Sequence, residues 1–206
     1  MGRLLTNFRT TVLLSLVLAG VMIYAFGSVA PGGFDRIFWQ AVFRWTHVFA
    51  GILWIGLLWY FNFVQIRVMP SIPAELKPAI GKHIAPEALF WFRWSALATV
   101  LAGLALAFSR GHAYAVEVLS FGLVQGLTDD QKGYTLMGIG VWLAIVMFLN
   151  VWGIIWPNQK RALGIVVVED DAKAKAARVA MLASRINMLL SLPMLTSMAM
   201  YQTLFG

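Results

Sequence analysis

The sequence predicts an all-α integral membrane protein, a single domain over residues 1–206 that is built as a bundle of five transmembrane helices. Hydrophobic residues make up 60% of the chain and charged residues only 12%, whereas soluble domains are about half apolar and about a quarter charged. A helix needs about 20 apolar residues to cross a bilayer, and the chain contains five such runs. We expect the spans at about residues 10–29, 45–66, 88–108, 133–156 and 181–204.

The first two spans are predicted from their length and their flanks. Basic residues precede the run at 10–29 and small residues follow it, as in a secretory signal peptide. We expect a membrane helix here, because the run is longer than the apolar core of a signal peptide. Arg44 and Trp45 are residue types that anchor a helix at the membrane interface, so the second span is expected to begin there and to end near Arg67.

The third span follows a proline-rich loop that has room for a short helix at residues 74–82. Pro86 and the glutamate after it form a favourable first helical turn, because proline has a helical φ and a carboxylate complements the positive end of the helix dipole. Ser95, Thr99 and Gly103 then recur at four-residue spacing. This stripe of small residues predicts a face that allows close contact with a neighbouring helix.

Turn and capping signals delimit the last two spans. Residues 116–123 have room for a short interfacial helix, and residues 128–131 have the spacing of a capping box that is expected to start the fourth helix. This helix should stop at Pro157. Acidic residues at 169–171 are expected to open a helix that continues into the fifth span, and Pro193 should bend it.

The distribution of basic residues predicts the orientation in the membrane. Eleven Lys and Arg residues fall at the N-terminus, in the loop between the second and third spans, and around the loop between the fourth and fifth, whereas the other two loops hold three. By the positive-inside rule the N-terminus is cytoplasmic and, after five spans, the C-terminus is periplasmic. We therefore expect a multi-pass protein of the bacterial inner membrane, in contact with membrane lipids. Orientation explains the net charge of +7, and no nucleic-acid motif is present.

His47 is the basic side chain inside the second span. An ionisable group in hydrocarbon needs a partner and marks a functional site by default. Gly51 and Trp54 follow at one and two helical turns, so the three residues share a face. We expect His47 to ligate the iron of a non-covalent haem b, with Gly51 leaving room for the macrocycle and Arg44 meeting its carboxylates. A lone histidine hydrogen-bonded to a neighbouring helix is the alternative.

The second axial ligand is less constrained. His112 follows the outer end of the third span at a depth similar to that of His47, so it is a candidate ligand, whereas His83 falls on the cytoplasmic side. Ten methionines offer thioethers as further ligands, although most methionines in apolar helices serve packing. Because the chain has no cysteine, covalent haem attachment, thiolate metal sites and disulfides are excluded.

Polar residues in the other spans are explained either by a functional role or by hydrogen bonding and snorkelling. Arg93 in the third span either extends its guanidinium to the interface or binds an anionic substrate. Asn150 and Asn187 are expected to hydrogen-bond between helices. The spans contain no carboxylate, which disfavours a transporter or a metal-handling protein.

Four stretches of the chain resemble the membrane domain of bacterial membrane-bound urate oxidases of the PuuD type. They carry the motifs H-V-x-x-G-I-x-W-I-G, N-V-x-x-x-I-x-P-N-Q-K/R and L-P-x-L, in that order, and lie at residues 44–62, 89–103, 138–161 and 187–198. The first motif alone also resembles the HemJ and CopD groups of membrane proteins. The resemblance implies a helical membrane domain associated with urate oxidation, in which His47 matches the family's histidine in the second helix and Arg93 a basic residue in the third.

The chain departs from this family at two further histidine positions, where it has residues such as Gly138 and Gln202. Family members pass electrons to a C-terminal cytochrome c domain, and a chain without cysteine carries no such domain. Two functions therefore stay open. One is a haem-b-binding redox protein, an oxidoreductase of urate-oxidase type, that passes electrons to a separate carrier such as a cytochrome c. The other is a non-catalytic accessory membrane subunit that packs against other subunits of a respiratory or photosynthetic complex.

Overall fold

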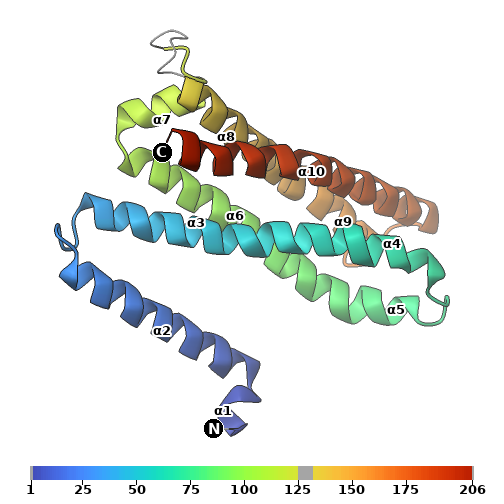
Figure 1. The fold of residues 1–206 in the computed structure, drawn as a ribbon. Helices are drawn as coiled ribbons and strands as arrows, with labels where there is room; N and C mark the ends of the chain where they lie inside the picture. The colour runs from blue at the N-terminus through green and yellow to red at the C-terminus, as the bar shows by residue number, and fades with distance from the viewer. Residues whose placement is uncertain (1, 125–131, 206) are drawn as a thin grey trace.

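The structure, a computed structural model, describes residues 2–124 and 132–205, and the regular structure of these residues is helical (Figure 1). Five helical segments are long and apolar enough to cross a membrane, which confirms an all-α chain with five candidate spans, although only four of them pack into one bundle. They are α2 (Phe8–Val29), which follows the short α1 (Gly2–Leu5); α3 (Arg36–Trp59) with η1 (Tyr60–Gln65), α4 (Ile66–Val68) and η2 (Met69–Ser71); α5 (Lys77–Ala79) with η3 (Ile80–Ile84) and α6 (Ala85–Ser109); α8 (Lys132–Asn150) with η5 (Val151–Ile155) and α9 (Trp156–Ala162); and α10 (Asp170–Leu204).

Pro86 lies in the first turn of α6, as predicted, and Pro157 in the first turn of α9, but neither marks the end of a helical segment. The helices continue through Pro86 and Pro157, and the residues at 74–82 form no separate helix, because α5 and η3 run directly into α6. A proline donates no hydrogen bond and its ring crowds the carbonyl four residues earlier. In both helices the turn before the proline widens to a π-helical turn, η3 and η5, which accommodates the ring without ending the helix.

The second membrane helix starts earlier than expected. Its N-cap is Asp35, whose carboxylate accepts a hydrogen bond of 2.9 Å from the Phe38 amide. Arg44 therefore lies about two turns inside the helix rather than at its beginning. The fifth helix begins as predicted, with Asp170 and Asp171 in its first turn, and it runs through Pro193.

Four of the five segments form the bundle. α3 packs along α6, α8 packs along α10, and α10 also contacts α3 (Figure 1). The centre is tightly packed, with Trp54, Leu58 and Met147 fully buried. Polar side chains hold the two pairs together, since Trp59 Nε1 donates to Ser191 Oγ at 3.1 Å.

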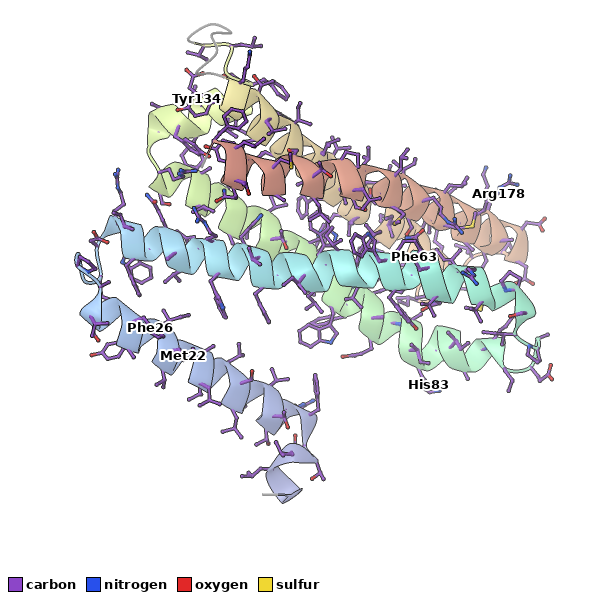
Figure 2. All side chains as sticks on the ribbon, viewed as in Figure 1. Met22, Phe26, Phe63, His83, Tyr134 and Arg178 are labelled. Carbon is purple, nitrogen blue, oxygen red and sulfur yellow. The ribbon has the colours of Figure 1, made fainter. Side chains whose placement is uncertain are left out.

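The remaining long helix, α2, stands apart from the bundle (Figure 1). Only 6% of its most apolar stretch is buried, and side chains such as those of Met22 and Phe26 are exposed (Figure 2). It touches the bundle at its end, where Gly27 allows the rings of Phe34 and Phe38 to approach its backbone. In a membrane this exposed apolar surface faces lipid or another protein.

A short helix, α7 (His112–Leu119), caps one end of the bundle. It lies slightly earlier than the segment at 116–123 that sequence suggested. It packs on α8, where Gly138 leaves space for the Val118 carbonyl and the Phe121 side chain. The expected capping box at 128–131 lies outside the described residues.

Candidate functional site

A cavity of about 560 Å³ lies at the α7 end of the bundle. Its walls come from α3 and α6 on one side and from α8 and α10 on the other, and α7 contributes to its end. Most of the lining is apolar, and the volume is in the range of pockets that hold cofactors and drug-sized ligands. Arg44, His47, Gly51 and Trp54 all line it, so the structure brings together the four residues that the second span offered as a site.

The imidazole of His47 is held in one orientation by α6. Its Nδ1 lies 2.8 Å from the carbonyl oxygen of Thr99. A carbonyl only accepts hydrogen bonds, so Nδ1 carries the hydrogen and the neutral ring keeps its lone pair on Nε2. No hydrogen bond between described residues involves Nε2. This bond to a neighbouring helix is what the structural alternative for His47 predicts, and it also leaves Nε2 available in the way that a metal-ligating histidine requires.

Gly103 makes room for the imidazole. A Cβ at this position would lie 2.8 Å from His47 Nδ1 and 2.9 Å from its Cε1, closer than real Cβ atoms come to other atoms. The stripe of small residues on α6 therefore accommodates a side chain of α3 at this point. Gly51 differs, because a Cβ there would meet Thr99 Cγ2 at 3.6 Å, an ordinary contact.

Two arginines line the same cavity. Arg44 is exposed, whereas Arg110, the C-cap of α6, is half-buried. Arg110 donates hydrogen bonds to the hydroxyls of Tyr114 at 3.0 Å and Tyr201 at 3.5 Å, and its guanidinium stacks on the Tyr114 ring, 4.5 Å from the centroid. Tyr114 in turn donates to Tyr201 at 3.1 Å. Burial, and then the hydrogen bond with Tyr201, raises the pKa of Tyr114, so this hydroxyl stays protonated at neutral pH.

The residues of the cavity wall also include a tryptophan whose indole N–H has no hydrogen-bond partner among the described residues, and several methionines with thioether sulfurs. Trp54 is fully buried, and its Nε1 has no hydrogen-bond partner among the described residues. A buried indole N–H normally finds an acceptor, so this donor is left unsatisfied by the described residues. The sulfurs of Met137, Met194 and Met198 are the candidate thioether ligands on the wall, and His47 is the one histidine on it.

Two predicted site residues lie elsewhere, as does the histidine that was not expected to be a ligand. His112 is exposed at the start of α7 and does not line the cavity. His83 lies in η3, at the opposite end of the bundle (Figure 2). Arg93 stacks on the Trp156 ring, 3.9 Å from its centroid, and does not line the cavity.

The two asparagines form one cluster between α8 and α10. Asn150 Nδ2 donates to Asn187 Oδ1 at 2.7 Å and to the Ala183 carbonyl at 2.9 Å. Asn187, which is fully buried, donates to the Met147 carbonyl at 3.0 Å. These amides join helices and do not reach the cavity wall.

The residues on the wall fit a haem. A porphyrin supplies four of the iron's ligands, so one fixed imidazole is sufficient as a protein ligand, and the two arginines suit the carboxylates of the macrocycle. By contrast, no three His, Cys, Asp or Glu side chains of the described residues gather as a bare metal ion would require. Comparison of the chain with protein-family profiles, with curated proteins and with solved structures found no match.

Sequence reasoning missed several residues of the site. The sequence predicts Arg110 only as a charge in a loop, because its partner Tyr114 lies on a different helix, α7, beyond the turn at Gly111. Tyr201 comes from a distant helix, and nothing in the sequence pairs it with Arg110. The role of Gly103 was also missed, because spacing predicts a close contact but not which side chain makes it.

Proposed function

We propose that this chain is a haem-b-binding membrane redox protein that passes electrons to a separate carrier. The observation that carries the proposal is the His47 imidazole, which is fixed through Nδ1 on the Thr99 carbonyl and lines a cavity of about 560 Å³. When bound, a haem supplies reversible one-electron chemistry at iron.

The residues of the chain supply binding, orientation and exclusion of water. Thr99 sets the tautomer and the ring orientation of His47, and Gly103 gives the ring its space. Arg44 and Arg110 bring positive charge to the wall, which favours the carboxylates of the cofactor. The apolar lining keeps water out and so tunes the redox potential.

The proposed setting is the bacterial inner membrane, with the N-terminus cytoplasmic and the C-terminus periplasmic. The excess of Lys and Arg in the loops at the α5 end of the bundle supports this orientation. It places the cavity near the periplasmic surface, where a separate cytochrome c can accept electrons. The resemblance to membrane-bound urate oxidases makes urate the first substrate to test.

The second candidate function is that of an accessory subunit of a larger membrane complex. The observation in its favour is α2, which packs on the bundle only at its end and leaves nearly all of its apolar surface open. In this reading the bundle has no redox activity and α2 contacts another membrane subunit.

A visible absorption spectrum of the purified protein distinguishes the two functions. We expect a Soret band that shifts on reduction with dithionite, that is lost in His47→Ala, and that returns when free imidazole is added to that variant. A correctly folded protein that stays colourless when hemin is supplied would refute the haem proposal. Loss of the ultraviolet absorbance of urate, in the presence of an oxidised cytochrome c, tests the substrate.

A further inference from the structure

A second cavity, of about 520 Å³, lies at the opposite end of the bundle, beside α5. It shares no lining residue with the first cavity. A packed layer separates the two, since Leu58, Met147 and Ser191 are fully buried and line neither cavity. The second cavity is therefore a separate space, surrounded by all four helical segments of the bundle.

The π-helical turns of the described residues converge on this cavity. Gln65 of η1, Gly81 of η3 and Ile155 of η5 all line it, so three different membrane helices contribute a π-helical turn each. A π-helical turn is rare and occurs frequently at functional sites, because it turns side chains out of the regular helical register. A proline accounts for η3 and η5, but none directly follows η1.

The polar groups on the wall favour a negatively charged ligand. Lys77 is half-buried, and its ammonium group forms no ion pair or hydrogen bond with another described residue. The lining also includes the amides of Gln65 and Gln159 and the hydroxyl of Ser184, but no Asp or Glu from the described residues. Gln65 Oε1 is buried and has no hydrogen-bond partner among the described residues, so this amide is left unsatisfied in the wall of the cavity.

We propose that the second cavity is a binding site for a small aromatic anion. Lys77 compensates the charge, the amides of Gln65 and Gln159 bind its polar atoms, and the rings of Phe61 and Phe92 pack on its aromatic body. These two rings meet edge to face with centroids 5.6 Å apart. The site does not depend on the haem proposal, because the two cavities have no residue in common.

The absence of natural cysteine gives a direct test. Ser184→Cys places one thiol on the wall of this cavity, and the rates of its reaction with an anionic reagent, sulfonatoethyl methanethiosulfonate, and a cationic one, trimethylammonioethyl methanethiosulfonate, are compared after correction for their rates with a free thiol. Ser191→Cys, about two turns along α10 in the packed layer, is the matched control. Ala180→Cys, on the same wall as Ser184, replaces the first variant if it does not fold.

We expect the anionic reagent to label Ser184→Cys about tenfold faster than the cationic one, since a cation in a low-dielectric cleft concentrates anions. Adding Lys77→Gln should remove this preference, and Ser191→Cys should stay unlabelled. Millimolar benzoate should slow the labelling of Ser184→Cys, whereas the neutral isostere benzamide should not. The proposal requires both the charge preference and the selective protection. Equal rates with the two reagents, no labelling of the folded protein, or equal effects of benzoate and benzamide would each overturn it.

Discussion

Replacing Gly103 by alanine is the sharpest perturbation of the haem proposal. The new Cβ would lie 2.8 Å from His47 Nδ1, so the imidazole must move. This movement lengthens or bends the hydrogen bond between Nδ1 and the Thr99 carbonyl, which is 2.8 Å long. This bond holds the ring in the orientation and tautomer that leave Nε2 available. The substitution therefore acts on the proposed iron ligand without removing it.

The expected size of the effect follows from what such a bond does in metal sites. Loss of a partner that orients a metal-bound histidine weakens metal affinity by about 10- to 100-fold. This corresponds to a loss of about 1.4 to 2.8 kcal/mol of binding free energy. The folded protein itself should not lose stability to the same extent, because alanine is a better helix former than glycine by about 1 kcal/mol.

Gly51→Ala is the matched control. It is the same substitution on the wall of the same cavity, but its Cβ meets Thr99 Cγ2 at an ordinary 3.6 Å. Titration of the purified variants with hemin, followed through the Soret band, should give a dissociation constant near that of the wild type for Gly51→Ala. Gly103→Ala should bind 10- to 100-fold more weakly, by the reasoning above. If the two variants bind alike, His47 is not oriented through α6 as the structure indicates.

Three further outcomes are expected. Asn187→Leu should lower the free energy of unfolding by about 1 to 3 kcal/mol in a detergent unfolding experiment, because it removes the bond from Asn150 Nδ2 to its fully buried partner. Arg110→Gln should weaken hemin binding more than Arg44→Gln, since the half-buried guanidinium is less screened by water than the exposed one, and equal effects would contradict this. The raised pKa of Tyr114 implies that unfolding stability is fully present below the ordinary tyrosine pKa and is lost as the pH rises above it. Tyr114→Phe should flatten that loss in thermal unfolding at alkaline pH.

The number and type of the membrane helices could be predicted from sequence because their signal is long and uniform. A run such as 10–29 contains no competing pattern, and the structure has a membrane-length helix over every predicted span. Helix ends were predicted less well. The sequence predicts a helix start at Pro86 and a helix end at Pro157, since a proline removes a backbone hydrogen bond, but a π-helical turn before each one lets the helical segment continue.

The candidate site was predictable where its residues lie on one helix. Arg44, His47, Gly51 and Trp54 follow from helical spacing on α3, and all four line one cavity. The groups that reach this cavity from other helices were not predictable, because helical spacing says nothing about which helices become neighbours. Tyr201 is 91 residues from its hydrogen-bonding partner Arg110, and no local pattern relates them.

The packed centre explains why one small bundle can hold two cavities. Leu58 and Met147 are fully buried there, and the amide of Asn187 joins α8 and α10 through the Met147 carbonyl. Interhelical bonds of this kind fix helices against one another in hydrocarbon, where an unpaired amide has no water to replace its partner. This packed layer keeps the two cavities separate. Substitutions at opposite ends that share no neighbour should then have additive effects, so Gly103→Ala should leave the labelling of a thiol at position 184 unchanged.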